Sequence, residues 1–99
     1  MKAFVNLWFL YRILFNAVKR AGFTVIEFSD QRAFFGYWSL TVEGHGATYL
    51  IVNEGRNGWM ICYRASAAGT ITELDKRESA WMDDTDKPAQ CLTWLSDFP

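Results

Sequence analysis

Short strand-forming runs separated by glycine-containing turns dominate the middle of this chain. The first run, Phe23–Phe28, is rich in β-branched and aromatic residues, a composition typical of strands. Three more runs follow at close intervals, at Phe34–Val42, Ala47–Asn53 and Trp59–Arg64. The segments that separate these three, residues 43–46 and 54–58, contain the glycines that tight reversals use. Consecutive strands joined by turns this short predict an antiparallel meander.

A helix is expected on each side of these strands. Residues 3–20 contain no glycine or proline, and Gly22 follows two basic residues, as at many helix C-termini. The acidic run Asp83–Asp86, with Pro88 close behind it, predicts the start of a second helix. Helix capping explains this acidic run without a metal ion, since the run lacks the spacing of a calcium loop.

The order of these elements predicts a two-layer α+β fold for residues 1–99, as a single domain. It consists of an N-terminal helix, an antiparallel meander of four or five strands, and a C-terminal helix on the same face of the sheet. The uncertain strand is the fifth. Residues 65–72 are small and polar and predict a loop or a short edge strand ending near Leu74, before a charged connector at 76–78.

Aromatic residues are more abundant than so short a chain can easily bury. The 99 residues include eight Phe, five Trp and four Tyr, and small domains bury a smaller fraction of their surface than large ones. Alternation along the strands places large rings on both faces of the sheet. Tyrosine and tryptophan are favoured at protein interfaces. The residues expected to contact a partner protein are Tyr37, Tyr49, Arg56, Trp59 and Tyr63.

The expected N-terminal helix lacks a clean polar face. Val5, Phe9 and Ile13 are spaced by four residues, and so form a stripe within the arc that its polar residues occupy. Two interpretations remain open. Either the helix packs on two sides within its own domain, or the stripe is the symmetric seam of a homodimer.

Charge and hydropathy argue against two classes of partner. The net charge is −1 and the ten basic residues are scattered, whereas nucleic-acid binders carry a basic excess or cluster. The element order is similar to that of double-stranded RNA-binding domains, but the acidic start of the second helix would repel phosphate. The apolar N-terminal run is interrupted by Asn6, Arg12 and Asn16, which fits neither a signal peptide nor a membrane span. A cytoplasmic protein with no nucleic-acid or membrane partner is expected.

No residue pattern indicates catalysis, a cofactor or a metal site. His45 stands between two glycines in a predicted turn, which is interpreted as a flexible hairpin tip without the rigid surroundings that a general base needs. Cys62 and Cys91 have no metal-ligand spacing and are expected to be buried and reduced. A disulfide between them is the alternative, because the sequence does not give their separation. The glycines at 55 and 58 lie between strands, whereas a phosphate loop leads into a helix. The chain is therefore expected not to be an enzyme.

The turns and aromatic residues between positions 8 and 65 resemble those of small bacterial immunity proteins. The resemblance rests on Ala21-Gly22-Phe23 after a helix, on the aromatic strand that follows, and on the hairpin segment Asn53–Trp59. It implies a non-catalytic domain that binds and occludes a toxin. Phage-encoded inhibitors of host defence proteins would show the same pattern. A homodimeric structural or ligand-holding domain is a further alternative, and a small enzyme is the least favoured.

Overall fold

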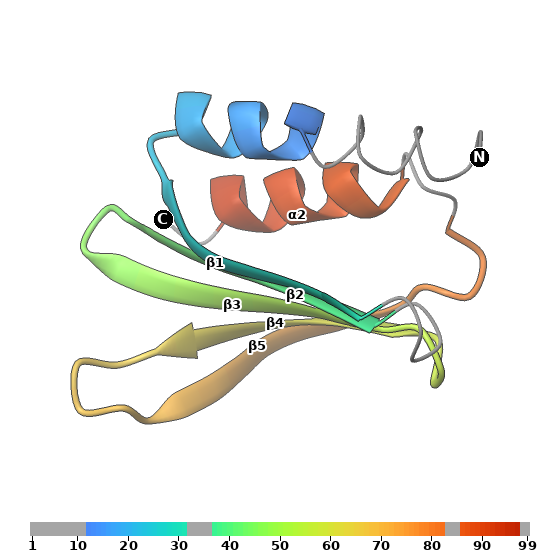
Figure 1. Ribbon diagram of the computed structural model, residues 1–99. Helices are drawn as coiled ribbons and strands as arrows, with labels where there is room; N and C mark the ends of the chain where they lie inside the picture. Colours follow the sequence, from blue (N-terminus) through green and yellow to red (C-terminus); the bar gives the residue numbers. More distant parts are fainter. Residues whose placement is uncertain (1–11, 32–36, 83–85, 98–99) are drawn as a thin grey trace.

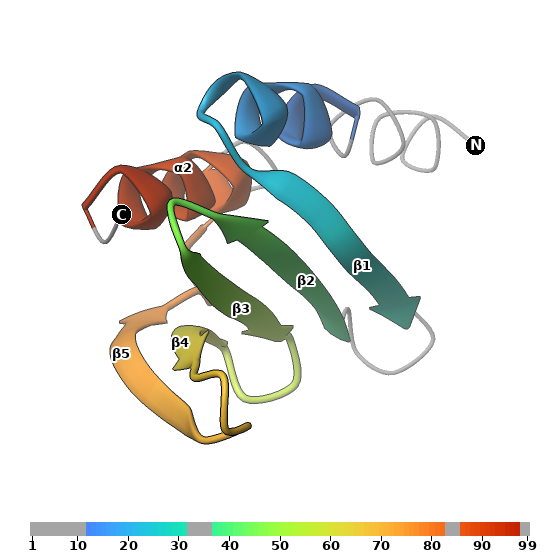
Figure 2. The ribbon, with the colours of Figure 1, turned by 90° about the vertical axis from the view of Figure 1, so that its left-hand side faces the viewer.

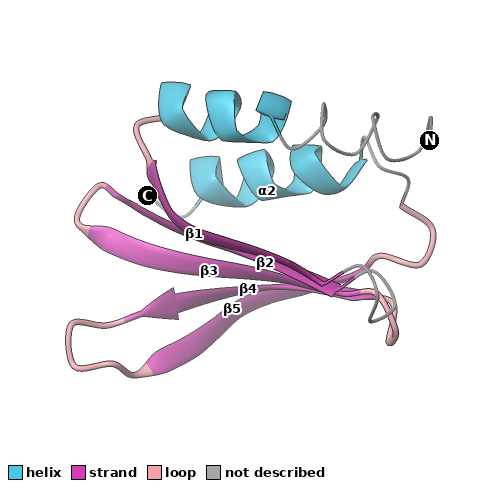
Figure 3. Ribbon diagram, viewed as in Figure 1, coloured by secondary structure: helices cyan, strands magenta, loops and turns pink. Residues whose placement is uncertain are grey.

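The computed structural model describes residues 12–31, 37–82 and 86–97. Its elements are an N-terminal helix (12–20), β1 (Thr24–Gln31), β2 (Tyr37–Gly44), β3 (Ala47–Glu54), β4 (Trp59–Ala65), β5 (Ile71–Glu78) and α2 (Asp86–Asp97). The strands form one antiparallel sheet in the order β1-β2-β3-β4-β5. Both helices lie on the same face of this sheet (Figures 1 and 3). The predicted two-layer α+β fold is thus confirmed.

The fifth strand is longer than the sequence predicted. β5 spans Ile71–Glu78 and pairs with the whole of β4, so the expected charged connector at 76–78 is part of a strand and that prediction was wrong. Charged side chains on an edge strand discourage pairing of its free edge with another chain. They also interrupt the alternation of apolar residues by which a half-buried strand is identified in sequence.

The N-terminal helix ends where the sequence predicted. Gly22 adopts a left-handed φ of 92°, its amide donates to the carbonyl of Lys19 at 3.0 Å, and the amide of Phe23 donates to Val18 at 3.1 Å. This pair of bonds is the Schellman arrangement, in which a glycine lets the chain reverse at a helix C-terminus. Phe23 is buried at this turn and directs the chain into β1.

The core lies between the helices and one face of the sheet, called here the inner face. Leu40, Ile51 and Cys62 are cross-strand neighbours on β2, β3 and β4, and all three are fully buried. The helices cover them with Leu14, Val18, Cys91, Trp94 and Leu95. The alternation predicted from sequence is confirmed in β2, where Trp38, Leu40 and Val42 are buried and the residues between them are not.

One carboxylate links α2 to the edge of the sheet. The indole Nε1–H of Trp94 donates to Oδ2 of Asp75 at 2.8 Å, and Arg77 Nε donates to the same oxygen at 2.9 Å. The hydrogen bond from Trp94 lowers the pKa of Asp75 despite the opposing effect of burial, and Arg77 lowers it further. Asp75 on β5 thus provides the buried ring of Trp94 with its polar partner.

We expect this carboxylate to make stability depend on acidity below its ordinary pKa of 3.8. The pKa of Asp75 is lower in the folded state than in the unfolded state, so its carboxylate stabilises the fold at pH values above 3.8. This stabilisation is lost as the pH falls through the pKa of the folded state. Asp75→Asn should cost about 1–2 kcal/mol at pH 7 and should flatten the loss of stability below pH 4. Urea denaturation at several pH values between 2.5 and 7 measures both effects. Parallel pH profiles for the two proteins would contradict the assignment.

Candidate functional site

The second face of the sheet, called here the outer face, is covered by no helix in the part of the chain that the structure describes (Figures 1 and 2). Strand register places three half-buried rings on it, Tyr37, Trp59 and Tyr63. Val52 and Ile61 face the same way and are only 8% and 5% exposed. These five residues are called the aromatic patch. Three of the five residues predicted to contact a partner, the three rings, therefore lie on one surface.

A lysine and two carboxylates lie close to these rings. Lys76 pairs with Ile61 across β4 and β5, and its Nζ lies 4.4 Å from the ring centroid of Trp59. Burial raises the pKa of the Tyr63 phenol, and the nearby carboxylates of Glu54 and Glu73 raise it further. Tyr63 therefore stays neutral at physiological pH, as a hydrogen-bonding group in an acidic setting.

All the glutamates of the chain lie on this outer face. They are Glu27, Glu43, Glu54, Glu73 and Glu78. In the described strands, Lys76 is the one basic residue on the outer face, because the register assigns Arg64 and Arg77 to the inner face. Three of these glutamates, Glu54, Glu73 and Glu78, lie directly opposite Trp59 or Tyr63. Against the single ammonium of Lys76, they give the described strands at these two rings a negative potential.

Arg56 is not on a strand of the aromatic patch. It belongs to the turn between β3 and β4, which borders an open depression of about 470 Å³ together with Ser79, Met82 and Lys87. The amide of Ser79 donates to the carbonyl of Gly58 at 2.7 Å and joins this turn to the segment after β5. The strand register therefore assigns Arg56 to neither face of the sheet, and its role in binding stays a prediction.

The prediction that Tyr49 contacts a partner was wrong. Its side chain is 1% exposed and belongs to the core, with its ring centroid 6.0 Å from that of Phe23. Tyr49 pairs with Val42, which is also buried, so the register turns both toward the helices. Alternation separates Tyr49 from its neighbours in β3 but does not say which set faces the core.

Trp81 is a candidate contact residue that the sequence analysis missed. It is 69% exposed, and lies two residues after Ser79 in the segment between β5 and α2. Tryptophan side chains are enriched among the residues that contribute most to binding at protein interfaces. The sequence did contain one indication of this, a large aromatic residue in a segment that has the periodicity of neither a strand nor a helix.

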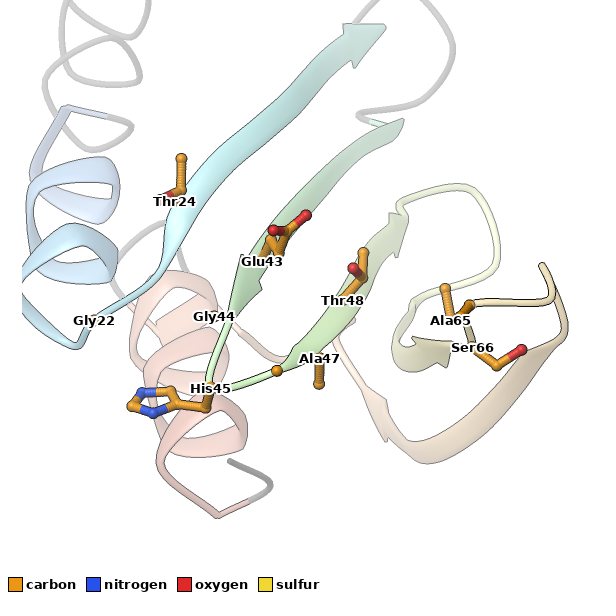
Figure 4. Close-up of a pocket in the computed structure, with 11 residues that line it drawn as sticks. Gly22, Thr24, Glu43, Gly44, His45, Ala47, Thr48, Ala65 and Ser66 are labelled. Carbon is orange, nitrogen blue, oxygen red and sulfur yellow. The ribbon is translucent and has the colours of Figure 1, made fainter.

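His45 is not the flexible tip that was expected. It has a left-handed φ of 54°, its Nε2 donates to the carbonyl oxygen of Ala21 at 3.2 Å, and its ring meets that of Phe23 edge-on at 4.8 Å between centroids. The imidazole therefore attaches the β2–β3 hairpin to the end of the N-terminal helix. In Figure 4 the ring points away from Glu43 and Thr48.

The depression shown in Figure 4 contains few side chains that could take part in a reaction. It has a volume of about 540 Å³ and is lined mainly by glycine, alanine and threonine, together with Glu43, His45 and Ser66. Among the described residues, no three histidine, cysteine, aspartate or glutamate side chains gather as a metal site requires.

Both cysteines are free and buried, as expected. Burial and the Asp75 carboxylate raise the pKa of Cys62 to about 12. Burial, and then the neighbouring Cys62, raise the pKa of Cys91. Both thiols are therefore protonated at neutral pH, and a buried thiol in this form is a poor nucleophile.

The homodimer seam stays a prediction. Val5 and Phe9 lie outside the described residues, while Ile13, on the N-terminal helix, is 44% exposed.

No described helix is both long enough and apolar enough to cross a bilayer.

No protein-family model, curated protein or solved structure matches this chain. The resemblance to immunity proteins therefore stays a prediction, and the outer face itself is the basis for assigning a function.

Proposed function

We propose that this chain is a non-catalytic binding domain that occludes another protein with the outer face of its sheet. The observation that supports this most is the aromatic patch, in which Tyr37, Trp59 and Tyr63 surround nearly dry aliphatic residues with no described helix over them. Tyrosine and tryptophan offer large, stiff contact areas, and binding energy concentrates on such residues.

The position of these rings in a sheet favours tight binding. Trp59 and Tyr63 are on β4, which pairs with a strand on each side, so the backbone beneath them is held by both neighbours. A surface that is already ordered loses little conformational entropy when it meets a partner. The surrounding glutamates add charge selectivity at the rim.

Among occluding proteins, we favour a toxin-neutralising immunity protein that acts in the cytoplasm. The size, the fold and the unreactive core are all compatible with such a role, and free thiols fit a reducing compartment. A phage inhibitor of a host defence protein would use the same face. The identity of the captured protein separates these two roles.

The experiment compares two double variants in affinity capture from the source organism. Trp59→Ala with Tyr63→Ala alters the outer face, and Lys19→Ala with Arg20→Ala makes an equal number of changes at exposed positions on the helix layer. The wild type and the helix-layer variant are expected to retain one stoichiometric partner. The outer-face variant should bind that partner at least about thirtyfold more weakly, because one hot-spot residue alone contributes about 2 kcal/mol or more.

The captured protein then decides between the roles. If it is a toxin, expressing it alone should stop growth, and co-expression with the wild type, but not with the outer-face variant, should restore growth. Capture of the same proteins by both double variants, or of none by the wild type, would rule out the outer face as the binding surface.

A further inference from the structure

We infer that the partner segment seated on the aromatic patch presents arginine side chains. This inference rests on the proposed function and specifies the chemistry of the occupant. It starts from the juxtaposition of rings and carboxylates on β3, β4 and β5. Trp59 has Glu54 directly opposite it on one side and Glu78 on the other, and Tyr63 has Glu73 opposite it.

Residues directly opposite each other on one face have Cβ atoms about 4.5–5.5 Å apart. Each ring of β4 therefore has at least one carboxylate within reach of a ligand that rests on it. A guanidinium group suits this combination, because it is planar, stacks on aromatic faces and donates two parallel hydrogen bonds to a carboxylate. An ammonium group, in contrast, is strongly hydrated and makes no planar stack.

Lys76 shows that a cation is accommodated here. Its Nζ sits over the Trp59 ring at 4.4 Å, in a region where Glu54, Glu73 and Glu78 outnumber it. Lys76 is exposed, and a surface contact of this kind is worth little. An arginine from a partner can therefore displace it and gain the carboxylates of Glu54 and Glu78 as well.

The two rings also define a spacing. Trp59 and Tyr63 are four residues apart on one strand, which corresponds to about 13 Å. An extended segment that runs alongside β4 would reach both rings with arginines at positions i and i+4.

The probe is a blocked pentapeptide with arginine at its first and last positions and three serines between them. It is titrated into the full chain, and backbone amide and indole shifts are followed by NMR. The expected shifts centre on the Trp59 indole and on the amides of β4 and β5. A matched peptide with citrulline at both positions keeps the shape of the side chains but loses their charge. Its affinity should be lower by a factor of about ten or more.

Three single variants test the geometry. Glu54→Gln and Glu78→Gln should each weaken the arginine peptide roughly two- to fivefold. Lys76→Gln removes the internal competitor and should strengthen binding by a similar factor. Glu43→Gln is the matched control, because it removes the same charge from the same face at the distant Thr24–Glu43–Thr48 row (Figure 4).

Equal binding of the arginine and citrulline peptides would overturn the inference, and so would a weakening by Lys76→Gln. Equal effects of Glu43→Gln and Glu54→Gln would mean that the peptide responds only to the overall negative charge of the face. That result would also overturn the inference. Concentration-dependent shifts on both the patch and residues 12–20, without peptide, would identify a second copy as the occupant instead. If the peptide fails while the outer-face double variant still loses its captured partner, the proposed function stands and only the arginine assignment falls.

Discussion

Replacing Trp94 with alanine is expected to lower the free energy of unfolding by about 3–5 kcal/mol, the largest effect of any single substitution considered for this protein. Trp94 is 1% exposed between α2 and the sheet, so its removal leaves a cavity in the core. It also removes the indole donor to Asp75. Since small domains are stabilised by only about 5–15 kcal/mol, the variant should unfold at a much lower urea concentration, as measured by far-UV circular dichroism.

A matched substitution controls for the loss of a tryptophan. Trp81→Ala makes the same chemical change at a side chain that is 69% exposed, and should alter stability by less than about 0.5 kcal/mol. Trp94→Phe covers the case in which Trp94→Ala does not fold, since it keeps an aromatic ring and mainly removes the hydrogen bond. It should cost about 1–2 kcal/mol. Equal stability of Trp94→Ala and Trp81→Ala would contradict the packing described for α2.

The second large effect is expected at Gly44, at the end of β2. A methyl group here would lie 2.7 Å from the carbonyl oxygen of Gly22 and 2.7 Å from Cδ1 of Phe23. The oxygen belongs to backbone at the helix end and cannot rotate away, and Phe23 is buried. Gly44→Ala should therefore cost about 1–3 kcal/mol by forcing the hairpin away from the helix. Urea denaturation measures the cost, and the NMR shifts of the His45 ring report the movement.

Gly46 provides the comparison within the same hairpin. It has a left-handed φ of 76°, and nothing lies within 4 Å of a methyl group added to it. Gly46→Ala should thus show only the backbone cost of that conformation, about 1 kcal/mol, and should leave the His45 ring in place. A larger loss for Gly46→Ala than for Gly44→Ala would mean that backbone conformation, not close contact, limits this turn.

The outer-face site was predictable in part. The aromatic content and the alternation of β2 and β4 led to Tyr37, Trp59 and Tyr63, and all three lie on the outer face. The same reasoning included Tyr49, which is in the core. Alternation divides a strand into two sets of residues, but which set meets the helices depends on how that strand pairs with its neighbours.

The acidic character of the outer face could not be recognised from the sequence for a related reason. Its five glutamates are spread over positions 27 to 78 and form no run in the sequence. They share a surface because four antiparallel pairings bring the five strands into one register. Trp81 was missed because exposure of a ring in a connecting segment depends on the packing around it.

Features that depend on short-range interactions could be predicted from the residues alone. Gly22 ends the first helix, glycine-containing turns separate β2, β3 and β4, and alternation divides each strand into two faces. Four features appear only in the folded protein. They are the choice of the buried face, the full strand at Ile71–Glu78, the contact of His45 with the helix end, and the position of Glu54, Glu73 and Glu78 beside the rings of the aromatic patch. These features depend on contacts between residues far apart in the chain, and such contacts exist only once the strands have paired.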